Sequence, residues 1–357
     1  MSQSILDNLV KIKQLDSQNM LGSLQLLSAQ VEQIYNTARE LKIPANYKNI
    51  NNVVVLGMGG SAIGTHVVKT LFADELKVPV EIINDYKLPK FVNNKSLVLA
   101  SSYSGNTEEV VEAVKQAKIK KAKILVISAG GKLKAFAKRN KLPALIFTTE
   151  NNPCGSPRMG LGYSIFGQLI LFSKVGLLKI SQTKIKEVVK ILAYYDGLFG
   201  ALTPTKENLA KQLAKLTIDK NVFYVGSEHL LGNVHIAANQ MNENAKRMAG
   251  YFALPELNHH LLEGMVNPKN NKTNLFFIMI LSDLYGIRVQ KRYGITSKVF
   301  DRQGIKHQTY KLQEKDKLMQ ACEILVLGSY ISYYSALLKN IDPTDIPFVD
   351  YFKVQMK

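Results

Sequence analysis

The chain has 357 residues, which is enough for one or two domains with a sizeable core. Hydrophobic residues make up 46% and charged residues 21%, an ordinary balance for a soluble globular protein. The formal net charge is +18, but the basic residues are scattered lysines and form no nucleic-acid-binding motif. We therefore expect small anionic partners and no specific nucleic acid.

Cysteine usage and hydropathy point to the cytoplasm. Cys154 and Cys322 lie far apart, so they give neither metal-ligand spacing nor a disulfide framework. The first residues lack the apolar core of a secretory signal. We expect no apolar run long enough to span a membrane, since the best stretch, Leu275–Leu281, has the length of a strand. We expect a cytoplasmic protein without membrane contact.

The first half of the chain predicts a helical arm followed by an α/β domain. Residues 1–48 carry apolar side chains at helical spacing. Residues 49–178 alternate strands and helices, which is typical of a doubly wound parallel sheet. The expected strands are Val53–Leu56, Val80–Ile83, Leu97–Ala100, Ile124–Ile127 and Ala144–Phe147.

The second half repeats this plan. Residues 179–220 are lysine-rich and helical, and they predict a bridge to a second sheet domain over 221–357. A helix is expected from about Glu228 to Ala249, a long apolar helix at Lys317–Lys339, and a short amphipathic helix at the C-terminus. The fold class is thus α/β with two doubly wound parallel-sheet domains. Strands are expected at Asn221–Gly226, Leu275–Leu281, Ser297–Asp301 and His307–Leu312.

Two strand–helix turns are candidates for anion binding. In VVVLGMGGSAIG (53–64), a buried strand runs into Gly57, Gly59 and Gly60, and Ser61 stands where a helix N-cap is expected. Such a turn presents backbone N–H groups to an anion at the positive end of a helix. A glycine-rich turn is also typical of a tight strand–helix connection without a ligand.

The second turn is SLVLASSYSGNT (96–107), which ends in the hydroxyls of Ser101, Ser102, Ser104 and Thr107. Serines and threonines favour helix starts, so a capping role alone is one interpretation. Because ligands bind at the carboxyl ends of parallel strands, both turns are expected to converge on one site. Hydroxyls and helix N-terminal amides together suit a phosphate monoester.

Three further segments offer acid–base groups. His235, Asn239 and Glu243 share one face of a predicted helix, which is either its wet side or the position of a general base. The adjacent histidines of PELNHH (255–260) suit a surface, a metal site or proton transfer, and without further ligands at metal spacing we favour proton transfer. Arg158 has either a structural role or that of an oxyanion partner.

These segments occur in an order that resembles one family. GMGGSAIG (57–64), SYSGNTEE (102–109), SPRMGLGY (156–163), NENAK (242–246), PELNHH (255–260) and IDPT…FK (341–353) are similar to the motifs of the bifunctional phosphoglucose/phosphomannose isomerases. The resemblance runs from about residue 20 to the C-terminus. It implies two sugar-isomerase (SIS) domains, each with a five-stranded parallel sheet, and a homodimer that works without a metal or other cofactor.

The resemblance also implies roles for individual residues. Glu243 looks like the base that moves a proton between C2 and C1 of the sugar through a cis-enediolate, and Arg158 looks like the residue that stabilises this intermediate. His259 matches the ring-opening histidine, with His260 beside it as the alternative, and Lys353 matches an assisting lysine. The phosphate would be held by Gly59, Gly60, Ser61, Ser102, Ser104 and Thr107.

The implied function is an aldose–ketose isomerase of glycolysis and gluconeogenesis. It would interconvert glucose 6-phosphate, and also mannose 6-phosphate, with fructose 6-phosphate in an active site shared across the dimer. One alternative is a non-catalytic regulator that binds sugar phosphates through the same domains, but the N-terminal 48 residues are short for a DNA-binding module. Another is the isomerase part of a glucosamine-6-phosphate synthase, which would need a glutaminase domain.

Overall fold

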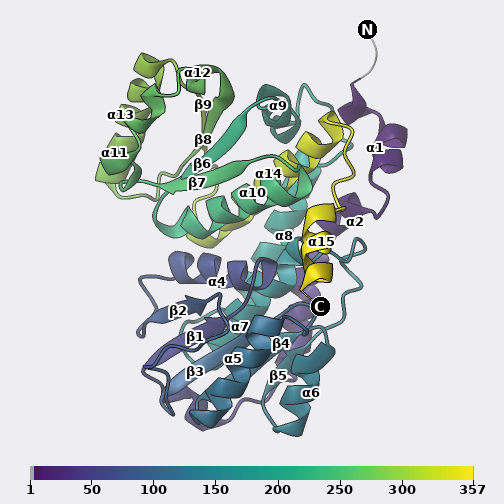
Figure 1. Ribbon diagram of the computed structural model, residues 1–357, viewed down its shortest axis with the longest axis vertical. Helices are drawn as coiled ribbons and strands as arrows, with labels where there is room; N and C mark the ends of the chain where they lie inside the picture. Colours follow the sequence, from purple (N-terminus) through teal and green to yellow (C-terminus); the bar gives the residue numbers. More distant parts are fainter. Residues whose placement is uncertain (1–3, 357) are drawn as a thin grey trace. The chain divides into compact units, whose positions relative to one another are not determined.

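The structure is a computed structural model that describes residues 4–356. It consists of two compact units, each built on one parallel sheet. The first-sheet unit is Leu26–Ala193, and the second-sheet unit is Met1–Gln25 together with Tyr194–Lys357. Figure 1 shows the elements of both units.

The first-sheet unit contains five parallel strands in the order β2-β1-β3-β4-β5. All five strands expected from the sequence are present within about one residue of their predicted ends. Every residue of β3 is buried, as expected for a parallel strand covered on both faces. The strands are β1 (Asn52–Leu56), β2 (Val80–Ile83), β3 (Ser96–Ser101), β4 (Lys123–Ser128) and β5 (Ala144–Ile146).

Helices cover this sheet because its strands expose apolar residues on both faces. Val54 and Val98 are register partners, and both lie in the core cluster that includes Val110 and Val114 of α5. The helices are α3 (Leu27–Arg39), α4 (Gly60–Leu71), α5 (Glu108–Ile119), α6 (Gly131–Arg139) and α7 (Gly167–Lys174). Short helical turns are η2 (Ala45–Lys48), η3 (Pro157–Met159) and the π-helical η4 (Gly162–Phe166), and α8 (Gln182–Phe199) leads out of the unit.

The second-sheet unit contains four parallel strands in the order β7-β6-β8-β9. The common strand order confirms the repeated plan, although the described residues hold four strands where the family resemblance implied five. The strands are β6 (Asn221–Gly226), β7 (Ala249–Ala253), β8 (Leu275–Leu281) and β9 (Lys306–Lys311). The longer helices are α9 (Leu209–Leu216), α10 (Leu231–Asn244), α13 (Ile287–Gln303) and α14 (Lys317–Leu338).

Two predictions for this unit were wrong. Ser297–Asp301, expected as a strand, lies inside α13, where Tyr293, Thr296 and Phe300 form the buried stripe of a helix. The helix expected to reach Ala249 ends at Asn244, and β7 begins at Ala249. The shorter elements are η5 (Glu228–Leu230), α11 (Leu257–His260), η6 (Gly264–Val266), α12 (Asn271–Asn274) and α15 (Pro347–Gln355).

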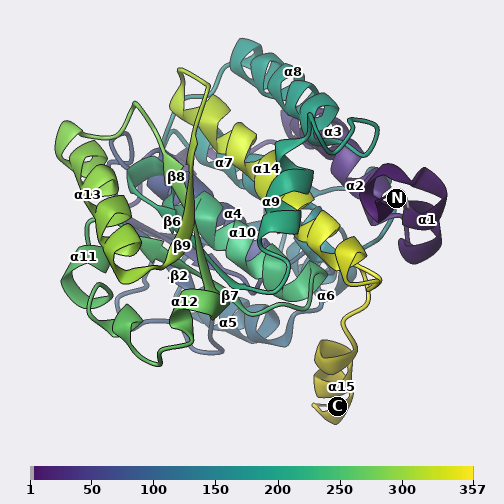
Figure 2. The same ribbon diagram turned by 90° about the horizontal axis from the view of Figure 1, so that it is seen from above.

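The helix α14 corrects the expectation that no segment has the length of a membrane span. Within residues 4–356, it is the one helix that is long and apolar enough to cross a bilayer. However, 94% of its most apolar stretch is buried inside the protein. A helix that is apolar all round and covered by neighbours such as α9 and α10 is the core helix of its unit. Figure 2 shows α14 beside these two helices.

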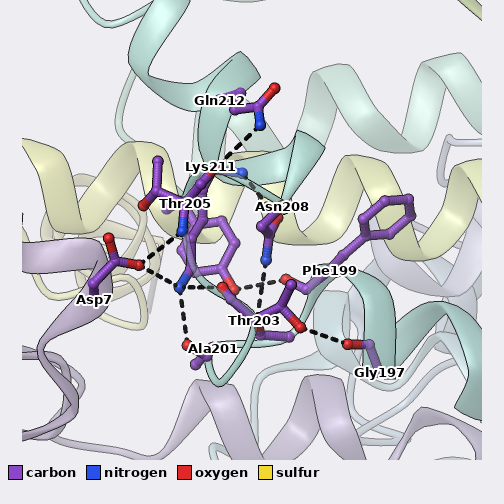
Figure 3. Close-up of polar contacts among 11 residues, drawn as sticks. Asp7, Gly197, Phe199, Ala201, Thr203, Thr205, Asn208, Lys211 and Gln212 are labelled. Atoms are coloured by element: carbon purple, nitrogen blue, oxygen red, sulfur yellow. Dashed lines mark hydrogen bonds and ion pairs between the residues drawn. The ribbon is translucent and has the colours of Figure 1, made fainter.

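An ion pair fastens the N-terminal segment to the rest of the second-sheet unit (Figure 3). The segment comprises η1 (Ile5–Asp7), α1 (Leu9–Leu15) and α2 (Met20–Gln25). The Lys211 side chain is fully buried, and its Nζ lies 3.1 Å from Asp7 Oδ1. It also donates to the carbonyls of Ala201 (2.9 Å) and Thr203 (2.8 Å), and it lies 5.5 Å from the ring centre of Tyr334.

The pKa shifts of this pair reflect the competition between burial and pairing. Burial would raise the pKa of Asp7, but hydrogen bonds from Thr205 and Lys211 hold it below its usual value. Burial lowers the pKa of Lys211, and the bond to Asp7 opposes that shift. The charge of Lys211 is therefore tolerated in the interior because a carboxylate, two carbonyls and an aromatic ring surround it.

We predict that Lys211→Met destabilises the protein by about 2–4 kcal/mol, because methionine fills the space but removes the cation beside Asp7 and the donor to two carbonyls. The readout is the urea midpoint followed by circular dichroism. The control is Lys206→Met, which removes an exposed lysine 3.3 Å from Glu207 and should leave the midpoint unchanged. Equal midpoints for the two variants would contradict a stabilising role for the buried pair.

Candidate active site

The first turn joins β1 to α4 and differs in one detail from the expectation. The helix α4 begins at Gly60, so its N-cap is Gly59 and not Ser61. Gly59 has a φ of +47°, a conformation that glycine adopts without a steric penalty, and the residue is exposed. Asn84, which follows β2, donates to the carbonyl of Gly57 across 2.6 Å. The turn is thus fixed from the neighbouring strand, and its outer backbone faces solvent.

Ser61 joins this turn to the second one. Its Oγ accepts a hydrogen bond from the Tyr103 backbone N–H at 2.9 Å. Its carbonyl accepts from Ser101 Oγ (2.9 Å) and from Gln168 Nε2 of α7 (2.8 Å). The two turns therefore converge, as their place at the carboxyl edge of neighbouring strands predicts. The buried hydroxyl of Ser61 is committed to holding them together.

The second turn, residues 102–107, is organised by its own hydroxyls. Ser102 Oγ lies 2.7 Å from Thr107 Oγ1 and accepts the backbone N–H of Gly105 at 3.1 Å. Ser104 Oγ accepts the N–H of Asn106. Ser102 is buried, Ser104 is exposed and Thr107 is half-buried. The six predicted phosphate ligands thus divide into a buried pair, Ser61 and Ser102, and an accessible group that includes Gly59, Ser104 and Thr107.

A third turn, between β4 and α6, supports the second. Gly105 has a φ of +72°, and a Cβ on this residue would fall 1.8 Å from the carbonyl oxygen of Gly130. The N–H of Lys132 donates to Asn106 Oδ1, and the N–H of Leu133 donates to the carbonyl of Gly105. We missed this turn in the sequence, although the pair Gly130–Gly131 after a buried strand is the same signal that marked the first turn.

Arg158 belongs to the same cluster of turns. It lies in η3, and its side chain is only 5% exposed. A Cβ on Gly60 would come within 3.0 Å of the Pro157 carbonyl oxygen, so this glycine lets the two backbones touch. Gln30 of α3 accepts from the Gly162 N–H and donates to the carbonyl of Met159, which fixes the segment after the arginine.

The space enclosed by these turns is small. A cavity of about 10 Å³ is lined by residues such as Ser61, Ser102 and Pro157. This volume is room for no more than a water molecule. A phosphate monoester is too large for this cavity, and Gly59 and Ser104 are exposed on the outer side of the turns.

The other candidate residues lie in the second-sheet unit. His235, Asn239 and Glu243 of α10 are all half-buried and follow one another at intervals of four residues, in agreement with a shared face. Asn242 clamps the end of the helix to β7, because its amide donates to the Ala249 carbonyl (2.9 Å) and accepts from the Ala249 N–H (3.0 Å).

The residue on the other side of Glu243 is fixed as well. Asn244 is buried and donates to Ser332 Oγ of α14 at 3.0 Å. Lys246 donates to the carbonyls of Asn244 and Asp342, which joins the NENAK and IDPT segments. The backbone of Glu243 is therefore held from both sides, while its side chain stays partly accessible.

The two adjacent histidines differ in their contacts. Both are exposed and lie on α11. His260 Nε2 lies 2.9 Å from Glu256 Oε2. The side chain of His259 makes no hydrogen bond to any residue between 4 and 356. The two histidines therefore differ in hydrogen bonding and not in exposure.

Lys353 lies on α15, a helix without a buried residue. Its side chain is 63% exposed, and its Nζ lies 3.7 Å from Asp350 Oδ1. The aromatic residues Phe348, Tyr351 and Phe352 of the same helix are also exposed. The structure thus gathers the two predicted turns and Arg158 in the first-sheet unit, and it places Glu243, His259 and Lys353 on three separate elements of the other unit.

We predict that Gly105→Ala weakens the binding of inorganic phosphate at least about ten-fold, because the new methyl group collides with the Gly130 backbone and a positive φ disfavours alanine. The measurement is calorimetric titration with phosphate. The control is Gly130→Ala, since Gly130 has an extended φ of 172° and open space at its Cβ. If both variants bind phosphate like the wild type, the second turn is not part of the phosphate site.

Comparisons with known protein families match a segment in each of the two units. The SIS domain family matches residues 46–152, and the family described as bacterial phospho-glucose isomerase C-terminal SIS domain matches residues 206–356. A hypothetical protein from Thermus thermophilus shares the fold, with a TM-score of 0.73 and 18% identity over 97% of this chain and 93% of its own. A putative phosphosugar isomerase from Clostridium difficile 630 gives a TM-score of 0.70 with 16% identity, over 94% of this chain and 97% of its own.

Curated relatives define the family more closely. A D-glucosamine-6-phosphate 4-epimerase from Sulfolobus acidocaldarius is 31% identical over 68% of this chain and 72% of its own. A bifunctional phosphoglucose/phosphomannose isomerase from Aquifex aeolicus is 29% identical, covering 92% of this chain and 97% of its own. The enzyme of that name from Caldicellulosiruptor bescii is 34% identical over 94% of this chain and 98% of its own. Since identity at this level extends over nearly the whole of both chains, the protein belongs to the family of bifunctional phosphoglucose/phosphomannose isomerases.

Proposed function

We propose that this protein is an aldose–ketose isomerase that interconverts glucose 6-phosphate, and also mannose 6-phosphate, with fructose 6-phosphate. The observation that carries the proposal is the convergence of three segments in one unit. They are the first turn between β1 and α4, the second turn at residues 102–107, and the turn that bears the buried Arg158. Family membership with enzymes of this name supports the same conclusion.

The phosphate group would bind on the outer side of the turns. Gly59, Gly60, Ser104 and Thr107 offer backbone N–H groups and hydroxyls at the starts of α4 and α5. The buried hydroxyls of Ser61 and Ser102 would act through the shape of the turns, because they hold Tyr103 and Gly105. This division refines the six-residue site that we expect from the sequence.

The proton transfer is assigned to Glu243. Its carboxylate would remove the proton from C2 of glucose 6-phosphate and return it to C1, while the hydroxyl proton moves from O2 to O1. A base for this step needs a fixed position and an accessible carboxylate. The clamped backbone on both sides of Glu243 and its half-buried side chain meet both requirements.

Stabilisation of the negative charge that develops on the cis-enediolate is assigned to Arg158. A guanidinium keeps its proton at any physiological pH, and its planar fork can meet two oxygens. Because only 5% of Arg158 is exposed to solvent, its field on a nearby oxyanion is screened little by water.

Ring opening is assigned to His259 with assistance from Lys353. Both imidazoles are exposed, but His260 is paired with Glu256, whereas the His259 side chain makes no hydrogen bond to the described residues. We further propose a homodimer in which the partner subunit supplies His259. The exposure of Phe348 (86%), Tyr351 (66%) and Phe352 (62%) on α15 supports such a partner, since contiguous exposed aromatic residues mark interaction surfaces.

The cellular setting follows from the same proposal. The reaction is reversible and would serve glycolysis and gluconeogenesis in the cytoplasm, where the two free cysteines, Cys154 and Cys322, stay reduced. The residues assigned here supply an acid, a base and an electrophile, so the chemistry calls for no cofactor. A regulator built on the same domains would bind sugar phosphates without turning them over.

We predict that Glu243→Gln lowers kcat at least about a thousand-fold and changes substrate affinity less than about three-fold, because the amide keeps the shape and loses the base. The assay follows fructose 6-phosphate formation from glucose 6-phosphate and from mannose 6-phosphate. The control is Glu207→Gln, an exposed carboxylate far from α10 in sequence.

The same assay separates the alternatives. A regulator would show binding without turnover in the wild type. An enzyme with the specificity named for the Sulfolobus relative would act at C4 of glucosamine 6-phosphate and leave glucose 6-phosphate unchanged. Loss of activity in the presence of a metal chelator would contradict the cofactor-free mechanism.

The shared site predicts complementation between two inactive variants. Glu243→Gln and His259→Ala are unfolded together and refolded, so that about half of the dimers are mixed. Each mixed dimer then holds one site with both residues intact, and roughly a quarter of the wild-type activity should return. Each variant refolded alone is the control. If mixed dimers form but stay inactive, both residues belong to one subunit.

A further inference from the structure

The second-sheet unit contains a cavity that the proposed reaction does not use. It lies between α13 and the segment around α11, which Figures 1 and 2 show side by side, and its volume is about 470 Å³. This is the size of pocket that binds metabolites. The lining residues are Asn258, Leu262, Arg288, Lys291, Arg292, Ile295, Thr296 and Val299.

One wall of the cavity is apolar, and all its charged lining residues are basic. Leu262, Ile295 and Val299 form the wall, and the three basic side chains lie on the first two turns of α13. No lining residue is acidic. Among the described residues, Arg288 and Lys291 make no ion pair, and the nearest carboxylates in sequence on the α11 side are Glu256, which pairs with His260, and the exposed Glu263.

The position of these charges on the helix is unfavourable without a counter-ion. The N-terminus of a helix carries a partial positive charge, so acidic residues are preferred there and basic ones are disfavoured. The first turn of α13 contains no acidic residue. Glu228 reaches this end and accepts the N–H of Gly286 at 2.9 Å, which compensates one backbone group but none of the three cations.

We propose that this cavity binds a nucleotide, in which a phosphate group is joined through a sugar to a planar aromatic base whose faces can pack on apolar side chains. The phosphate would meet Arg288 and Lys291, and the ring would pack on Ile295 and Val299. Arg292 is preorganised for such a ligand, because its Nη1 already donates to Asn258 Oδ1 at 3.1 Å and its other donors have no partner among residues 4–356.

The site is coupled to the proposed catalytic histidine. The amide of Asn258 is held on both sides by α13, since it also donates to Thr296 Oγ1 at 2.8 Å. Asn258 directly precedes His259 on α11. A ligand that binds Arg292 would therefore change the contacts of Asn258, the residue next to His259. An effect on catalysis through His259 rests on the proposed function, whereas binding of the ligand does not.

The test uses AMP as the probe and inorganic phosphate as the comparison. Calorimetric titration should show that AMP binds the wild type more tightly than phosphate does at this site, and that Arg288→Ala combined with Lys291→Ala lowers the AMP affinity at least about ten-fold. The matched control is Lys298→Ala, which removes an exposed lysine of the same helix that does not line the cavity. Gly105→Ala should leave AMP binding unchanged, because it alters only the phosphate turns.

A second readout locates the ligand without reference to activity. In proton–carbon spectra of the histidine side chains, AMP should shift the signals of His259 and His260 and leave that of His66, on α4 behind the phosphate turn, in place. A shift of His66 alone would mean that AMP occupies the phosphate turns and would overturn the proposal. The proposal would also be overturned if AMP does not bind at millimolar concentration, or if the double variant binds AMP with unchanged affinity. Dissociation of a dimer by the double variant would overturn it as well, because the cavity would then be an interface between copies.

Discussion

The oxygens of Ser61 are the point on which the candidate phosphate site depends. One hydroxyl and one carbonyl together receive hydrogen bonds from Tyr103, Ser101 and Gln168, so they connect two turns and α7 at the edge of the first sheet. All three bonds are buried or half-buried, where an unpaired partner would cost about 1–3 kcal/mol. Because Ser61 satisfies these groups, the outer backbone of Gly59 and the hydroxyl of Ser104 stay available to an anion. The candidate site is therefore an exposed surface whose shape is fixed by the hydrogen bonds of Ser61 beneath it.

The sequence predicted this edge well because its signals are local. Apolar strands followed by glycines or hydroxyls mark the ends of β1 and β3, and their convergence follows from parallel-sheet geometry. Other features depend on partners far away in the chain. Gln168 carried a usable signal, a polar residue at the start of an apolar run, yet its partner Ser61 is 107 residues distant. The same holds for Lys211, which looks like an ordinary lysine of an amphipathic helix and is buried by an aspartate 204 residues away. Local patterns reveal which side chains are polar, and tertiary contacts decide which of them are buried.

The errors in the second half have a similar origin. The segment around Val299 and Phe300 has the composition of a strand. However, the stripe of buried residues that begins at Tyr293 has helical spacing, and its packing stabilises the helix α13 over this segment. β7 was overlooked because it is an edge strand whose residues are half-exposed and include Gly250, so neither alternation nor a buried run marks it. The N-cap was misplaced by two residues because Gly59, with its positive φ, allows the chain to enter the helix before the serine.

The two sheets share one plan but differ at the edge where ligands bind. In the second sheet, the turn after the central strand β6 begins with Ser227, whose Oγ donates to the Leu254 carbonyl at 2.6 Å and whose N–H donates to the hydroxyl of Tyr285. After the neighbouring β8, the hydroxyl of Ser282 is buried against Gln320. Glu228 adds a carboxylate where the first sheet has a glycine-rich turn. Side chains of the unit thus satisfy the groups that the first sheet leaves exposed, and a carboxylate repels phosphate there. This difference between the two edges favours the first sheet for the proposed phosphate site, whereas the proposed acid–base residues lie on α10 and α11 of the second-sheet unit.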